Sequence, residues 1–269
     1  MSTIGFVGSG NMGEALIKGI LTAKVYSPEN VFISDIRAER LKFLAEKYNV
    51  IAIDSNAKLA AKVQTVVLSI KPQNMTEALE SIKEAIGTDK LVISIAAGVK
   101  VANIAAVLGD IAIVRVMPNT PALIGEGASA LFANERAKPM LADARSIFSS
   151  VGRAVVVDDE DMIDAVTAVS GSGPAYYFLL MEEMIKAAVE LGLPEDVAKE
   201  LVLQTAKGAG LLAAEADKNN ETPPELRRKV TSPGGTTEAA LKVFAANNFS
   251  QLIADALTAA RDRSKELSG

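Results

Sequence analysis

A glycine-rich run near the N-terminus carries the strongest structural signal in the chain. It reads Ile4-Gly5-Phe6-Val7-Gly8-Ser9-Gly10-Asn11-Met12-Gly13, an apolar strand-like segment that leads directly into the spacing GxGxxG. In such a loop the first glycine makes a tight turn, the second lets the backbone approach a pyrophosphate, and the third lets the next helix pack closely on the strand. The helix N-terminus then faces the negative charge. The run predicts a dinucleotide-binding site; the alternative is a structural turn without a ligand.

An acidic residue stands where such sites hold a ribose. Asp35 lies 22 positions beyond Gly13, at the end of the second predicted strand, where a carboxylate can accept a hydrogen bond from the 2′-hydroxyl of NAD. Arg37 follows two residues later, and a guanidinium there can instead bind the 2′-phosphate of NADP. The structural alternative is that both residues only begin and cap the next helix. Asp35 therefore favours NAD and Arg37 favours NADP, and the sequence leaves both cofactors open.

The N-terminal part of the chain alternates short β-branched runs with amphipathic segments, as in a parallel sheet covered by helices. The predicted strands are residues 3–7, 31–35, 50–53, 65–70, 91–95, 111–117, 125–132 and 153–158. The predicted helices between them are residues 12–23, 37–48, 75–86, 101–108 and 139–150. This pattern predicts an α/β, Rossmann-like dinucleotide-binding domain at residues 1–157.

Beyond Asp158 the period-two runs vanish, and Ala, Leu, Glu and Lys recur at helical spacing. The predicted helices are residues 159–169, 175–191, 194–216, 223–229, 237–247 and 249–265. We expect an all-helical second domain at residues 158–269. It is rich in Ala, Leu, Ile and Val, so we expect it to bury one face in an obligate dimer or a larger ring.

Composition excludes several classes of function. The chain has no Cys and no His, which excludes disulfides, thiolate nucleophiles, serine triads and the commonest metal ligands, so we expect no metal site. The net charge is −5 without a basic stripe, which argues against nucleic acid. The apolar runs are far shorter than the ~20 residues of a membrane helix, and the N-terminus lacks a signal-peptide pattern. We expect a cytoplasmic protein with no membrane partner.

Three further loops follow predicted strands. They are Ser69-Ile70-Lys71-Pro72, Ile95-Ala96-Ala97-Gly98 and Met117-Pro118-Asn119-Thr120-Pro121. Ligands of open α/β sheets lie over the carboxyl ends of the strands, so we expect these loops beside the nicotinamide half of the cofactor. The alternatives are that Lys71 is a solvated lysine, that the two alanines only pack, and that Asn119 belongs to a rigid structural turn between prolines.

Two glycine-rich motifs interrupt the helical region. Ser170-Gly171-Ser172-Gly173-Pro174 breaks a helical pattern, and because glycines inside helices are costly, we expect a structural kink or a close contact there. Ser232-Pro233-Gly234-Gly235-Thr236-Thr237 precedes a predicted helix, and its successive amides form an anion-accepting nest suited to a small carboxylate. Alternatively, Thr236 or Thr237 is only the N-cap of that helix.

Taken together, GFVGSGNMG, SIKP, SIAAG, VMPNTP, SGSGPAY and SPGGTT, in this order and spacing, resemble the pyrroline-5-carboxylate reductase family over essentially the entire chain. The resemblance implies a dinucleotide domain followed by a helical dimerisation domain, in homodimers that often assemble into decamers. It implies reduction of 1-pyrroline-5-carboxylate to L-proline, the last step of proline biosynthesis. The cofactor implied is NADPH, with NADH as the alternative.

The resemblance also implies site residues. With the loops above, the predicted cofactor-binding residues are Val7, Gly8, Ser9, Gly10, Asn11, Met12, Gly13, Asp35, Arg37, Asn56, Ser69, Ile70, Lys71, Pro72, Ile95, Ala96, Ala97 and Asn119. The turn Gly235-Thr236-Thr237 matches the segment that binds the substrate carboxylate and imine nitrogen. We expect Thr237 to be catalytic by hydrogen-bonding the ring nitrogen. Glu160 matches a carboxylate near the substrate, or is simply a charge at a helix start.

Two alternative functions are less consistent with the sequence. β-Hydroxyacid dehydrogenases share the glycine fingerprint, but they use a lysine shortly after a glycine pair at the start of the helical domain. Here Pro174-Ala175-Tyr176-Tyr177 follows the glycines, and the next lysine is Lys186. A regulatory protein that senses NADP without turnover would have no need for the SPGGTT nest.

Overall fold

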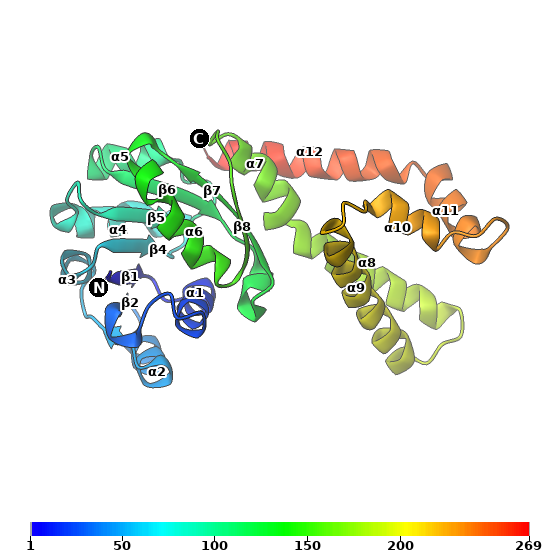
Figure 1. Ribbon diagram of the computed structural model, residues 1–269, viewed down its shortest axis with the longest axis horizontal. Coiled ribbons are helices and arrows are strands. Elements are labelled where there is room, and N and C mark those ends of the chain that lie inside the picture. Colours follow the sequence, from blue (N-terminus) through cyan, green and yellow to red (C-terminus); the bar gives the residue numbers. More distant parts are fainter. Residues whose placement is uncertain (1, 269) are drawn as a thin grey trace. The chain divides into compact units, whose positions relative to one another are not determined.

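The computed structural model describes residues 2–268 and contains one mixed sheet of eight strands (Figure 1). The strands are β1 (Ile4–Val7), β2 (Val31–Ser34), β3 (Ile51–Ala52), β4 (Thr65–Leu68), β5 (Leu91–Ser94), β6 (Ala112–Met117), β7 (Gly127–Ala133) and β8 (Gly152–Val156). Their order is β3-β2-β1-β4-β5-β6-β7-β8. Each strand predicted from the sequence overlaps an observed one.

The sheet departs from the predicted parallel pattern at one strand. The pairs from β3 to β6 are parallel, but β7 runs antiparallel to β6, and β8 then runs parallel to β7. Only residues 118–126 join β6 to β7. A parallel connection needs a crossover of a dozen or more residues, so this short loop forces the chain to turn back.

Helices cover both faces of the sheet (Figure 1). One face carries α1 (Asn11–Thr22), α2 (Ala38–Tyr48) and α6 (Leu141–Ser149), and the other carries α3 (Asn56–Lys62), α4 (Met75–Ile82) and α5 (Val101–Leu108). Successive strand residues alternate between the two cores: Phe6 joins the first and Val7 the second. The sequence did not predict α3, and α4 is shorter than expected because its end tightens into a 3₁₀ turn at Lys83–Ala85.

After β8, every described element is helical. These elements are α7 (Met162–Val166), a π-helical turn (Thr167–Gly171), α8 (Gly173–Glu190), α9 (Glu195–Asp217), α10 (Pro223–Lys229), α11 (Thr236–Ala246) and α12 (Phe249–Leu267). The chain forms two compact units. The sheet unit comprises the residues up to Pro174 and those from Thr258 onward, and the helical unit comprises Ala175–Leu257. Among residues 2–268, no helix combines the length and apolar character that a membrane span requires.

The SGSGP motif has the structural role that the sequence predicts. The amide of Ser172 donates to the carbonyl of Thr167 over 2.8 Å, which closes the wide π turn. A Cβ atom on Gly171 would lie 2.5 Å from Cε of Met117, at the end of β6. Glycine at this position therefore permits the close contact between the helical turn and the strand end.

Candidate active site

A groove of about 790 Å³ opens at the carboxyl ends of β1, β2 and β4. Strand β1 pairs with β2 on one side and β4 on the other, so the groove lies where the strand order reverses. Ligands of open α/β sheets bind at this switch point. The predicted cofactor residues that line the groove together are Val7, Gly8, Gly10, Asn11, Asp35, Arg37, Asn56, Ser69, Ile70 and Lys71.

The three glycines of the loop have the geometry that a bound dinucleotide requires. Gly8 has φ +84°, and a Cβ atom there would lie 2.5 Å from the carbonyl oxygen of Ser69. A Cβ atom on Gly13 would lie 3.1 Å from the carbonyl oxygen of Gly8, so Gly13 allows close packing of α1. A Cβ atom on Gly10, by contrast, would meet no other group of residues 2–268 within 4 Å. The open space at the middle glycine fits the approach of a pyrophosphate.

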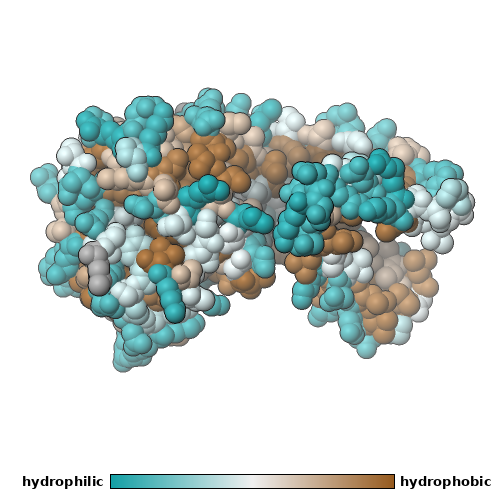
Figure 2. Space-filling view, in the orientation of Figure 1, coloured by the Kyte–Doolittle hydropathy of each residue, from teal (hydrophilic) through white to brown (hydrophobic). Residues whose placement is uncertain are grey.

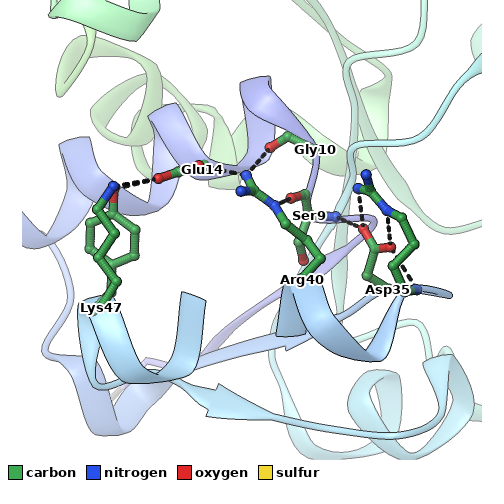
Figure 3. Close-up of polar contacts among 8 residues, drawn as sticks. Ser9, Gly10, Glu14, Asp35, Arg40 and Lys47 are labelled. Atoms are coloured by element: carbon green, nitrogen blue, oxygen red, sulfur yellow. Dashed lines mark hydrogen bonds and ion pairs between the residues drawn. The ribbon is translucent and has the colours of Figure 1, made fainter. Parts of the chain in front are cut away.

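Asp35 and Arg37 form an ion pair at the edge of this groove. One carboxylate oxygen of Asp35 accepts the Ser9 amide at 2.9 Å, and the other accepts both the amide and Nε of Arg37 at 3.0 Å (Figure 3). Burial alone raises the pKa of Asp35, but the hydrogen bonds from Arg37 and Ser9 outweigh it and lower the pKa. Arg37 is the N-cap residue of α2, as expected if it caps the helix. Its largely exposed side chain also lines the groove, so it remains available to a cofactor.

Several predicted cofactor residues do not line the groove, namely Ser9, Met12, Gly13, Pro72, Ile95, Ala96, Ala97 and Asn119. Asn119 is held by structural contacts at both ends of its amide: Nδ2 donates to the carbonyl of Ser170 at 3.0 Å, and Oδ1 accepts the amide of Ala128 at 2.8 Å. These bonds fit the alternative that Asn119 belongs to a rigid structural turn. For all eight residues, contact with the cofactor stays a prediction.

The groove also includes residues that sequence reasoning missed. They are Ile36, Gln73, Asn74, Glu77, Ala78 and Ser81. Ile36 is 96% exposed, which is unusual for a large apolar side chain. Its position between two charged groove residues was the signal that could have identified it. It offers an apolar surface beside Asp35 and Arg37.

Glu160 belongs to a buried ion pair that the sequence did not reveal. One of its carboxylate oxygens accepts Nη1 of Arg115 at 2.9 Å and the amide of Val101 at 2.8 Å. The Arg115 side chain is 2% exposed and lies within β6, where a charge in an apolar strand could have drawn attention. Val101 is the first residue of α5, directly after the loop that follows β5. Glu160 therefore caps a helix, but that helix is α5 rather than its own.

The turn before α11 leaves the predicted substrate groups accessible. Gly235 is the N-cap and no side chain caps the helix, so the alternative that Thr236 or Thr237 is the cap was wrong. Within residues 2–268, the hydroxyls of both threonines make no hydrogen bond. The amides of the first helical turn have no intrahelical acceptor. Donors for a carboxylate and a hydroxyl for a nitrogen thus lie in one turn.

Comparisons with known proteins agree with this geometry. Residues 160–267 match the family described as pyrroline-5-carboxylate reductase dimerisation, and residues 3–98 match the family described as NADP oxidoreductase coenzyme F420-dependent. The pyrroline-5-carboxylate reductase of Pseudomonas aeruginosa is 46% identical over 99% of this chain and 98% of its own length. The chain belongs to the pyrroline-5-carboxylate reductase family.

Solved structures of pyrroline-5-carboxylate reductases share the fold over the whole chain. The enzyme of Coxiella burnetii has a TM-score of 0.95 and 41% identity, covering 100% of this chain and 99% of its own. The Plasmodium falciparum enzyme, solved with NADP bound, has a TM-score of 0.86 and 32% identity, covering 100% and 98%. The family and the fold predicted from the sequence are both confirmed.

Proposed function

We propose that this protein reduces 1-pyrroline-5-carboxylate to L-proline with hydride from a nicotinamide dinucleotide. The observation that carries the proposal is a dinucleotide groove at the switch point of the sheet, in a chain 46% identical over 99% of its length to a pyrroline-5-carboxylate reductase. The glycine loop holds the pyrophosphate, and Asp35 with Arg37 meets the adenosine ribose. When bound, the cofactor supplies the hydride.

NADPH is the preferred cofactor in this proposal, with NADH as the alternative. The Arg37 guanidinium is 61% exposed at the groove and can pair with a 2′-phosphate. Asp35 remains an acceptor for a 2′-hydroxyl, but its carboxylate already receives four hydrogen bonds from protein nitrogens of Ser9 and Arg37. Ile36 provides apolar contact for the adenine ring.

The substrate side of the proposal rests on the turn before α11. A neutral imine is a poor hydride acceptor, so its nitrogen must be protonated or hydrogen-bonded, and the chain has no His for this task. The amides of Thr236 and Thr237 bind the substrate carboxylate, while the Gly235 amide donates to the Ser232 carbonyl at 3.0 Å and holds the turn in shape. The Thr237 hydroxyl then hydrogen-bonds the adjacent ring nitrogen and orients the substrate. The proton on that nitrogen comes from solvent or is already present in the iminium form of the substrate.

The sequence predicted a catalytic role for Glu160, but we propose that Glu160 positions the loop before α5. Its carboxylate is engaged by Arg115 and by the Val101 amide, so it acts through the N-terminus of α5 and the loop before it. The ion pair and the amide contact hold this carboxylate in place, so its contribution is to fix the start of α5. The loop that it supports contains the predicted nicotinamide residues Ile95, Ala96 and Ala97.

We propose that the protein forms a homodimer and that these dimers assemble into a larger ring such as a decamer. We place it in the cytoplasm, and we expect its only other partner to be a small-molecule substrate. The dimerisation match over residues 160–267 and the exposed apolar side chains of the helical unit support the homodimer. Functionally, residues 1–157 form the cofactor domain and residues 158–269 the substrate and dimerisation domain.

Steady-state kinetics with the purified protein test the function. We expect oxidation of NADPH, followed at 340 nm, that depends on added 1-pyrroline-5-carboxylate and yields proline in equal amount. NADH should support a slower reaction. The proposal is wrong if neither cofactor is oxidised with the imine between about pH 6 and 9 while the protein stays folded.

A further inference from the structure

Arg40, on α2, reaches the backbone of the glycine-rich loop from a position outside the groove (Figure 3). Its Nε donates to the carbonyl of Ser9 at 2.7 Å, and its Nη2 donates to the carbonyl of Gly10 at 3.4 Å. The same Nη2 pairs with the Glu14 carboxylate on α1. The Arg40 side chain is only 18% exposed, so these contacts are shielded from water.

Arg40 complements the hydrogen bonds that the loop makes elsewhere. A loop that turns amides toward a phosphate turns carbonyls away from it, and those carbonyls need donors of their own. Arg40 supplies donors to two successive carbonyls, which a planar guanidinium can do and a lysine ammonium does less well. On the other side, the Ser9 amide is held by Asp35. Residues 9 and 10 are therefore held by two side chains that follow β2 in the sequence.

Glu14 keeps Arg40 in this position. Burial alone raises the pKa of Glu14, but hydrogen bonds from Lys47, Tyr48 and Arg40 lower it to about 2. The carboxylate is therefore ionised at neutral pH. It lies in the first turns of α1, where an unpaired negative charge would oppose a bound pyrophosphate.

We propose that Arg40 is a positioning residue for the cofactor: it holds the Ser9-Gly10 backbone in the shape that binds the pyrophosphate before the cofactor arrives. Glu14 fixes Arg40, and neither side chain touches the ligand. The inference rests on the proposed function only in taking a dinucleotide as the ligand. It predicts a loss of cofactor affinity from a residue that lies outside the groove.

Lys47 provides a matched control. It is also a cation on α2, it also pairs with Glu14, and it stands 5.1 Å from the Phe43 ring centroid, as Arg40 stands 5.5 Å from it. Its ammonium donates to Glu14 at 3.0 Å, and among residues 2–268 it donates to no carbonyl of the loop. A difference between Arg40→Ala and Lys47→Ala therefore reports the two loop carbonyls rather than the charge of Glu14.

The experiment measures the Kd of NADPH by fluorescence titration without substrate, alongside kcat and hydrogen exchange of residues 9–13 in the cofactor-free protein. Arg40→Ala should raise Kd about tenfold, since two charge-assisted hydrogen bonds that order the loop are lost. Loop exchange should accelerate, while kcat at saturating cofactor should change less than about twofold. Lys47→Ala should change Kd less than about twofold, and Arg40→Lys should fall between wild type and Arg40→Ala.

Other results would overturn the inference. If Lys47→Ala raises Kd as much as Arg40→Ala, or if Glu14→Gln restores wild-type Kd to the Arg40→Ala variant, then Arg40 acts only by neutralising Glu14. If Arg40→Ala fails to fold, Arg40→Lys decides, and a wild-type Kd in that variant rejects the proposal. Failure of the proposed function is distinguishable, because the wild-type protein would then show no imine-dependent NADPH oxidation, whereas failure of this inference leaves wild-type turnover intact.

Discussion

The two compact units differ in how much of their apolar side-chain content they bury, because nearly all buried apolar residues lie in the sheet unit. In the sheet unit, Phe6, Val67 and Ile93 are fully buried between the strands and the covering helices. In the helical unit, Phe178 is 60% exposed and Leu252 is 62% exposed, and Figure 2 shows hydrophobic side chains gathered on the surface of its helices. The sheet unit therefore buries its core with its own strands and helices. The helical unit exposes many large apolar side chains on its surface, as proteins do at interaction sites.

This contrast separates two kinds of contribution to function. The sheet unit can form its cofactor groove within one chain, because the groove lies at the ends of strands already packed on both faces. The helical unit needs further cover for its apolar surface, and the dimerisation match over residues 160–267 supports a second copy as that cover. The predictions below test each side of the contrast.

The largest effect is expected from a charge placed on the apolar surface of the helical unit. Phe178→Asp would leave an unpaired carboxylate in the interface, at a cost of about 4 kcal/mol, or roughly a thousandfold in dissociation constant. Light scattering should show a smaller species with little activity, yet the cofactor should still bind. Gln251→Glu, a charge at an exposed polar site in the same unit, is the control. An oligomer of unchanged mass in Phe178→Asp would show that this surface is not an interface.

The next effect concerns catalysis by the helical unit. Thr237→Ala should lower kcat/KM roughly ten- to a thousandfold, the scale of one transition-state hydrogen bond, with NADPH affinity nearly constant. Thr236→Ala is the matched control, because only its backbone amide is assigned to the substrate. Equal losses in the two variants, measured by initial rates, would remove the special role of the Thr237 hydroxyl.

A smaller effect is expected for the buried ion pair of the sheet unit. Glu160→Ala strands Arg115 and uncaps α5, which we expect to lower the free energy of unfolding by about 2 kcal/mol, a value reduced because Glu160 is 18% exposed. Asp161→Asn breaks the exposed 3.8 Å pair with Lys100 and should cost at most about 0.5 kcal/mol. Urea denaturation measures both. Similar values for the two variants would show that the Arg115 pair adds no stability.

The smallest effect is a change in cofactor preference. Asp35→Ser should raise the NADPH to NADH ratio of kcat/KM several-fold, and Arg37→Ser should lower it. The pKa of Asp35 is lowered, so its carboxylate stays charged from about pH 6 to 9, and the wild-type ratio should be constant from about pH 7 to 9, where the 2′-phosphate is fully ionised too. Initial rates with both cofactors provide the test. An unchanged ratio in Asp35→Ser would place Asp35 away from the ribose.

Local patterns were sufficient for most elements of the fold. The strands were predictable because each joins β-branched residues in a short apolar run, and α5 and α10 end at the predicted residues. The sequence did not reveal helix α3, because its seven residues lack the N-terminal prolines and the capping box that mark the equally short α10. The GxGxxG spacing and Asp35 identified the groove, since both follow directly from the ends of β1 and β2.

The sequence by itself determined the order of elements, the glycine loop and the family, because these depend on residues close together in the chain. Only the tertiary structure decided which distant groups meet. Glu160 lies 45 residues from Arg115 and 59 from Val101, and Arg40 lies 31 residues from Ser9. No periodicity connects such pairs. Their contacts exist because packing of helices on a twisted sheet brings strand ends and helix N-termini together, where a buried charge must find its partner.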